Sequence, residues 1–225
     1  VSVVAMSSCR DVDHAVSGIR GADGLHWVHA WGIVDNDRRP DDEIRTLKDR
    51  GVYALSVFSV ESIYYHPEIQ RKLAVRQVAV TGDDADELVR QATNAAIAAI
   101  RPHAGRLSSR TAEKAVRKAF FSHLPNRNDI SAEAAPINVE INVAAAVAEE
   151  LGRLGAALDA EDLALVFSHY PVRETPALDP IARSLGFQGR KQYEKAVLKL
   201  LEEDAETLEF VRSLFDTLVD DIDAA

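Results

Sequence analysis

Between residues 1 and 60, apolar and polar positions alternate in short blocks. The apolar runs at 1–6, 29–34 and 52–58 predict strands, because each is a short hydrophobic segment between polar ones. The stretches 11–20 and 41–50 have amphipathic, helical spacing, and Pro40 with the acids after it is typical of a helix start. This strand–helix rhythm predicts the α/β class, with a small parallel sheet.

After about residue 76 the strand pattern fades and helical spacing dominates. We expect a short strand at 78–80 and a loop at 125–136. The chain is therefore expected to have two parts. They are an α/β core over residues 1–80 and a mainly α-helical region over 81–225 that ends in an acidic tail. The predicted helices of that region cover 83–100, 108–123, 142–158, 160–169, 180–185, 189–201 and 205–219.

Composition excludes several classes of protein. With 225 residues, 47% of them hydrophobic, the chain can bury a substantial core. A single cysteine, Cys9, excludes a disulfide framework within the chain and a cysteine-rich zinc site, and it fits a reducing compartment. No window reaches the roughly 18 continuous apolar residues of a membrane helix. We therefore expect a cytoplasmic protein with no membrane partner.

The formal charge of −10 is unevenly distributed. The segment 202–225 holds nine acidic residues and one basic residue, whereas 101–127 holds seven basic residues and one acidic residue. Four of these cations are spaced by four and so share one helix face, which suits the phosphate backbone of DNA or RNA. A solvated face, or a partner surface for the acidic tail, is the alternative. The four are Arg106, Arg110, Lys114 and Lys118.

Two carboxylates follow the predicted strand at 29–34. Asp35 and Asp37 lie where the carboxyl ends of parallel strands usually bind ligands. Neighbouring carboxylates repel each other unless a cation or several amide donors neutralise them, and Mg²⁺ or Mn²⁺ is the simplest neutraliser. The alternative is a solvated Asp-rich turn that caps the next helix.

The stretch GIVDNDRRPDDEIRTLKDRGVYALSVFSVESIYYHPEI resembles the core of a Toprim domain, in the version found in OLD-family nucleases and related ATPase-associated proteins. Asp35, Asp37, Gly51 and Glu61-Ser62 match that version in order. The later stretch YPVRETPALDPIARSLGFQGRKQYEKAVLKLL resembles the helical tail of the same group, with Lys191 as its active-site lysine. Toprim domains also carry a glutamate at the end of their first strand, whereas the first glutamate here is Glu43. We therefore expect that the first Toprim strand is missing and that this piece alone lacks part of its site.

The resemblance implies a Mg²⁺- or Mn²⁺-dependent endonuclease, with Asp35 and Asp37 as catalytic metal ligands and Glu61 as the third carboxylate. It implies that Lys191 stabilises charge on the phosphate, and Arg38 and Arg39 are placed to contact phosphates beside the cut. It also implies an ATPase domain or subunit as partner, a homodimer as an option, and a role in phage defence. For Glu61 the alternative is an acid favoured by a helix N-terminus, and for Lys191 a solvated helix face.

Other functions fit part of the pattern. Glycosyltransferases also end a strand in Asp-x-Asp to hold Mn²⁺ and a nucleotide diphosphate. Dehalogenase-type phosphatases use the same pair, but usually with Thr or Val where this chain has Arg39. A Toprim-like module without activity, which dimerises or docks onto an ATPase, is the non-enzymatic alternative. An assay of metal-dependent phosphodiester cleavage distinguishes these possible functions.

Overall fold

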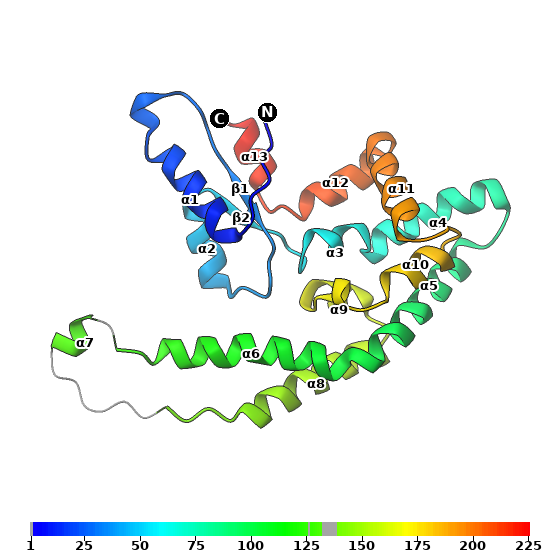
Figure 1. Ribbon diagram of the computed structural model, residues 1–225. Coiled ribbons are helices and arrows are strands. Elements are labelled where there is room, and N and C mark those ends of the chain that lie inside the picture. Colours follow the sequence, from blue (N-terminus) through cyan, green and yellow to red (C-terminus); the bar gives the residue numbers. More distant parts are fainter. Residues whose placement is uncertain (1, 126, 132–138) are drawn as a thin grey trace.

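The computed structural model describes residues 2–125, 127–131 and 139–225, and a small parallel sheet lies near its N-terminal end (Figure 1). Strand β1 (Gly32–Val34) pairs with β2 (Val52–Ala54), with Ile33 opposite Tyr53. The carboxyl ends of parallel strands lie at the same edge of a sheet, so the loops after β1 and β2 are neighbours. A small parallel sheet followed by a mainly helical region confirms the predicted fold class.

Two helices cover the sheet, and both begin where the sequence provides a start signal. The hydroxyl of Ser8 accepts a hydrogen bond from the Asp11 amide at the start of α1 (Cys9–Arg20), and Pro40 precedes α2 (Asp41–Asp49). A Cβ atom on Gly32 would lie 2.5 Å from Cγ1 of Val12, so α1 packs closely on β1 only because this position is glycine. The small core beneath them consists of Val16, Val34, Leu47, Val52 and Ala54.

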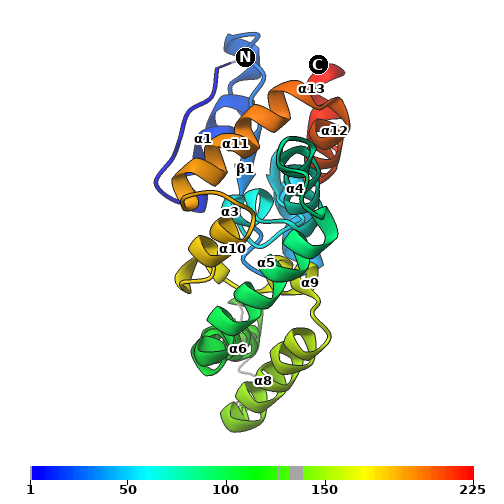
Figure 2. The ribbon, with the colours of Figure 1, turned by 90° about the vertical axis from the view of Figure 1, so that its right-hand side faces the viewer.

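Most of the remaining helices share a second, larger core. In Figure 2, α5, α6, α8, α9 and α10 lie below the sheet, and α12 and α13 lie beside it near the C-terminus. Short 3-10 turns also occur, of which η2 (Arg101–His103) joins α5 to α6 and η3 (Val172–Glu174) follows α9. The helices are α3 (Val60–Tyr64), α4 (Pro67–Thr81), α5 (Ala85–Ile100), α6 (Ala104–Ser122), α7 (Arg127–Ser131), α8 (Val143–Asp159), α9 (Leu163–His169), α10 (Leu178–Ser184), α11 (Arg190–Glu203), α12 (Ala205–Ser213) and α13 (Leu218–Asp223).

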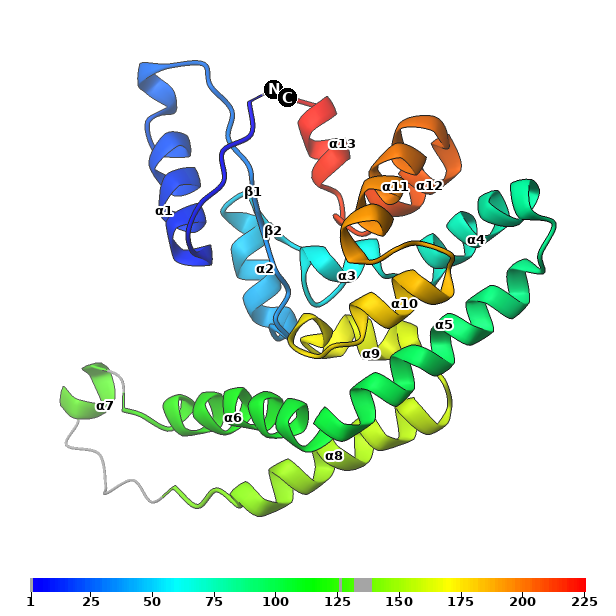
Figure 3. The same ribbon diagram turned by 45° about the vertical axis from the view of Figure 1, so that its right-hand side comes forward.

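Helices α6 and α8 lie side by side and extend away from the rest of the helical body (Figures 1 and 3). The middle of α6 lies opposite the loop after β1, because Lys114 contacts Asp37. The helix pair therefore places one face of α6 opposite the carboxyl edge of the sheet.

The main hydrophobic core is built around three stacked aromatic rings. Tyr65 packs between Phe167 and Tyr193, with ring centroids 6.4 and 4.8 Å from its own. All three side chains are almost completely buried. The same cluster of buried side chains extends from Leu55 to Leu214, so a division at residue 80 does not separate two hydrophobic cores.

Two predicted strands are wrong. Residues 2–6 form no strand, and Val3 is 93% exposed, because this apolar run has no strand beside it to complete a ladder. Residues 78–80 belong to α4, and helices α3 and α4 were not predicted. The ends of α4 explain this result, because Pro67 occupies its first turn and Gly82, at φ 78°, ends it. These helix start and stop signals are stronger evidence than the three apolar residues at 78–80, which show no periodic pattern.

Other elements differ only in their bounds. The predicted strand at 52–58 ends at Ala54, and the predicted helix at 205–219 is divided into α12 and α13. Asp216, at φ 56°, lies in the turn between them. The predicted loop at 125–136 contains α7, and its residues 126 and 132–136 lie outside the described residues.

Candidate functional site

Three carboxylates gather at the carboxyl edge of the sheet. Asp35 directly follows β1, Asp37 lies two residues further on, and Glu61 is in the first turn of α3, shortly after β2. Oδ1 of Asp35 accepts a hydrogen bond from the backbone N–H of Val60 at 3.1 Å, which joins the two loops. The amide of Asp37 donates to the carbonyl of Phe58 at 3.1 Å. The parallel topology thus holds the loop after β1 against the segment that carries Glu61.

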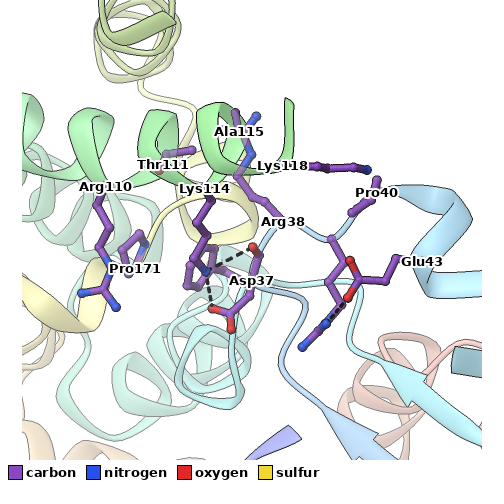
Figure 4. A pocket seen from close by; sticks show the side chains of 12 residues that line it. Asp37, Arg38, Pro40, Glu43, Arg110, Thr111, Lys114, Ala115, Lys118 and Pro171 are labelled. Carbon is purple, nitrogen blue, oxygen red and sulfur yellow. Dashed lines mark hydrogen bonds and ion pairs between the residues drawn. The ribbon is translucent and has the colours of Figure 1, made fainter. Parts of the chain in front are cut away.

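The loop after β1 has a strained backbone. Asp37 and Arg38 have φ angles of 51° and 58°, in the left-handed region that residues other than glycine rarely occupy. Each such residue costs on the order of 1 kcal/mol, and such strain is common at functional sites. The turn directs the carboxylate of Asp37 toward Nζ of Lys114, which lies 3.2 Å from Oδ1 (Figure 4).

The three carboxylates affect one another. Burial raises the pKa of Asp35, and the charges of Asp37 and Glu61 raise it further, against the hydrogen bond from Val60 and the charge of Arg173. Burial also acts to raise the pKa of Glu61, but the pKa is lowered overall by hydrogen bonds from its own amide and from Ser59, together with Arg173. The charge of Arg173 thus favours the ionised forms of Glu61 and Asp35.

Arg173, in η3, supplies part of that charge and was missed by the sequence analysis. Its Nη1 donates to both carboxylate oxygens of Glu61, at 3.1 and 3.0 Å. Burial acts to lower the pKa of Arg173, but the charges of Glu61, Asp35 and Asp37 outweigh it and raise this pKa. Arg173 is 112 residues from Glu61 in the sequence, so no local pattern pairs them. The only signal is its position within the second resemblance stretch.

Arg38 and Arg39 hold in place the loop after β1, which carries Asp35 and Asp37 and is called the carboxylate loop below. Nη1 of Arg38 lies 2.6 Å from Oε2 of Glu150, a buried residue of α8 that also pairs with Arg153. Nε of Arg39 donates to the carbonyl of Asp35 at 3.3 Å, and its Nη1 pairs with Glu43. Contact with phosphates stays a prediction for both arginines.

The four cations of α6 share one face, as their spacing indicates, and each pairs with an acid near the carboxyl edge. Arg106 and Arg110 both meet Glu174 of η3, with Nη1 of Arg110 only 2.5 Å from Oε1. Lys114 pairs with Asp37, and Nζ of Lys118 lies 3.7 Å from Oδ1 of Asp42. All four remain about half exposed, so solvent and ligands can reach them.

A pocket of about 430 Å³ opens between α6 and the loop after β1 (Figure 4). Its volume is within the range of pockets that hold small molecules or single nucleotides. It combines a cationic rim with an apolar surface, the combination that an anion with a flat apolar part requires. The cations are Arg38, Arg39, Arg110, Lys114 and Lys118, the apolar side chains are Pro40, Phe58, Ala115 and Pro171, and the acids Asp37 and Glu43 and the polar Thr111 complete the lining.

Lys191 lies apart from these contacts. It is an exposed residue in the first turn of α11, and it makes no hydrogen bond or ion pair within the described part of the chain. The neighbouring Arg190 pairs instead with Glu194. Asp37 and Glu61 are paired with Lys114 and Arg173, and a catalytic role for Lys191 stays a prediction.

The donor chemistry of Asp35, Asp37 and Glu61 fits a hard divalent cation, because all three supply carboxylate oxygens. Within residues 2–125, 127–131 and 139–225, however, no three His, Cys, Asp or Glu side chains come close enough together to hold an ion. Two of the three carboxylates are paired with Lys114 and Arg173. A metal ion would therefore have to replace internal cations that neutralise the same charges.

Comparison with known proteins provides no relatives: no family model, curated protein or solved structure matches the chain. No helix of the described residues is long and apolar enough to cross a membrane.

Asp35→Asn is expected to raise the free energy of unfolding at pH 7. Because the pKa of Asp35 is raised in the folded state, the folded protein keeps this proton more readily than the unfolded chain does. The wild type should therefore lose stability as the pH rises from about the unfolded value of 3.8 through the raised value, and stay less stable above it. Asparagine can still accept the hydrogen bond from Val60 without this cost.

Urea unfolding of both proteins between pH 3.5 and 7 checks this prediction. The difference between variant and wild type should shrink toward the acidic end, which serves as an internal control. A variant that is less stable than the wild type at pH 7 would contradict the assignment of Asp35 as a carboxylate destabilised by burial and by its neighbours.

Proposed function

We propose that the chain is the metal-dependent nuclease domain of an OLD-like, Toprim-type protein that hydrolyses phosphodiester bonds in DNA or RNA. The observation that carries this proposal is the position of Asp35, Asp37 and Glu61 at one sheet edge, directly opposite the basic face of α6. A nuclease needs both parts, carboxylates for a divalent metal and cations for the neighbouring phosphates.

In this proposal Asp35 and Asp37 bind Mg²⁺ or Mn²⁺, with Glu61 as a third carboxylate. When bound, the metal would activate water and neutralise charge on the leaving oxygen. In the reaction, a water oxygen forms a bond to phosphorus, one P–O ester bond breaks, and the departing oxygen takes up a proton. The strained turn at Asp37 and Arg38 fixes the direction of the carboxylate, and the Arg38–Glu150 pair supports that turn.

The α6 cations would bind the strand on either side of the cut. Arg110, Lys114 and Lys118 line the pocket beside Asp37, so they are placed to contact phosphates there. Their long side chains can leave the acids that they pair with in the absence of nucleic acid, because each exposed ion pair contributes about 0–1 kcal/mol to stability. The resemblance further supports control by an ATPase domain or subunit, a homodimer, and a role in phage defence, whereas cytoplasmic action is supported by the single cysteine.

The test incubates the chain, alone and with an ATPase partner and ATP, with supercoiled plasmid and with transfer RNA in Mg²⁺ or Mn²⁺. Cleavage that a chelator stops is expected, and the susceptible substrate identifies DNA or RNA. If neither substrate is cut under any of these conditions, the non-catalytic docking module becomes the better account. The pairing of Asp37 and Glu61 with internal cations is the observation that favours that second candidate.

Lys114→Ala is expected to weaken nucleic-acid binding and to reduce the dependence of log K on log salt by about one unit of slope. Lys114 supplies one phosphate contact in the proposed binding mode, and such a contact carries no sequence preference. Fluorescence anisotropy of a labelled oligonucleotide in chelator, over a range of salt, measures both quantities.

Lys199→Ala is the matched control, because Lys199 is an exposed lysine of α11 that pairs with Glu202 and Glu203, on its own helix. Equal losses of affinity in the two variants would show that binding responds to net charge alone and not to the α6 face.

A further inference from the structure

Two adjacent residues of η3 have opposite charges and contact the two halves of the site, which are the carboxylates at the sheet edge and the basic face of α6. Arg173 donates to both oxygens of Glu61, on the carboxylate side. Glu174 meets Arg110 and Arg106, on the side of the basic helix, and its backbone carbonyl accepts a further hydrogen bond from Nη2 of Arg106 at 2.5 Å. One short turn therefore places a cation where the proposed metal belongs and an anion where a phosphate belongs.

The turn that presents these side chains is fixed by the core. Val172 is 2% exposed and Thr175 is also buried, and Oγ1 of Thr175 donates to the carbonyl of Val172 at 2.7 Å. Tyr170, just before the turn, is completely buried. Arg173, in contrast, is 40% exposed at its side chain and Glu174 is 20% exposed. The backbone is thus held in place, while the two charged side chains can rotate away.

We propose that Arg173 and Glu174 are internal substitutes for the metal ion and the substrate phosphate, and that they hold the free site in a self-neutralised form. This inference rests on the proposed nuclease function. Metal binding has to displace Arg173 from Glu61, and phosphate binding has to displace Glu174 from Arg110. Each ligand is therefore bound more weakly than it would be by the same site without these side chains. A ligand that offers a metal ion and a phosphate together replaces both partners at once.

The competition at the carboxylates is tested by Mn²⁺ binding to the whole chain, followed by electron paramagnetic resonance. Arg173→Gln is expected to bind Mn²⁺ about tenfold more tightly than the wild type, because Glu61 is released and one nearby cation is lost. Arg190→Gln is the matched control, because Arg190 acts on Glu61 through space but makes its hydrogen bonds to Glu194. The control should shift the affinity by less than about twofold.

The competition at the basic face is tested by binding of a single-stranded oligonucleotide in chelator. Glu174→Gln should tighten binding about five-fold, because Arg106 and Arg110 become free for phosphate. Glu113→Gln, on α6, removes the same charge from an exposed residue that pairs with Arg117 and not, among the described residues, with Arg106 or Arg110, so it controls for net charge. Thermal melts of the four variants verify that each is folded.

The possible outcomes separate this inference from the proposed function. Suppose that Asp35 is required for Mn²⁺ binding but Arg173→Gln binds Mn²⁺ no more tightly than the wild type. The proposal that Arg173 takes the place of the metal ion is then wrong, and the proposed metal site stands. The same holds if Glu174→Gln and Glu113→Gln behave alike. If no variant, Arg173→Gln included, binds Mn²⁺ in a way that requires Asp35, both proposals fail.

Discussion

Replacing Asp35 and Asp37 together by alanine is expected to lower metal-dependent cleavage at least about 1000-fold. The substitution removes two of the three carboxylates at the carboxyl edge of the sheet, and loss of even an outer partner of a metal ligand typically costs 10- to 100-fold. The measurement is the initial rate of cleavage of the susceptible substrate at saturating Mg²⁺. Binding of the oligonucleotide in chelator should not weaken, because the variant loses negative charge and keeps the α6 cations.

Asp49→Asn is the control for this experiment, because Asp49 is an exposed residue at the C-terminal end of α2, just before the amino end of β2 and not at the carboxyl edge of the sheet. Its cleavage rate should equal that of the wild type. A double variant of Asp35 and Asp37 that still cuts at more than a tenth of the wild-type rate would show that the metal is bound elsewhere.

Phe167→Ala is expected to lower the free energy of unfolding by about 3–5 kcal/mol. Phe167 is 1% exposed and stacks on Tyr65, so its removal leaves a cavity within the largest cluster of buried side chains. Its backbone carbonyl also accepts a hydrogen bond from Phe58, whose own carbonyl holds the amide of Asp37. The same substitution should therefore loosen the carboxylate loop. Urea unfolding followed by circular dichroism measures the loss.

Phe121→Ala is the matched control, because this phenylalanine of α6 is 61% exposed. It should change the free energy of unfolding by no more than about 0.5 kcal/mol. Similar losses in the two variants would contradict the placement of the core around Phe167.

Local patterns predicted the parts of the fold that local forces determine. The pair of strands at 32–34 and 52–54, with α1 and α2 around them, follows from short apolar runs between segments with helix start signals. The strand predicted at 78–80 failed because periodicity cannot assign three apolar residues, and Pro67 and Gly82 marked the ends of a helix there. The strand predicted at 1–6 is absent from its described residues 2–6 because a strand requires a neighbour, and the sequence does not show which segments are neighbours.

The candidate site was predictable only in part, for a similar reason. The positions of Asp35, Asp37 and Glu61 after two parallel strands could be inferred from the order of elements, and the α6 face from its spacing of four. The partners of these residues come from distant segments. Arg173, Glu174 and Glu150 reach the site through the packing of α8 and η3, which no local pattern encodes. Lys191 was chosen by its place in a motif, without knowledge of what it contacts.

The most direct test of the metal site at the sheet edge is a titration of Mn²⁺ into the whole chain and into its Asp35→Ala, Asp37→Ala double variant, followed by electron paramagnetic resonance. We expect the wild type to bind Mn²⁺ and the double variant to lose that binding, whether or not the right nucleic acid has been found. Equal Mn²⁺ binding by the two proteins would contradict the assignment of these carboxylates as the metal site, and with it the proposed nuclease.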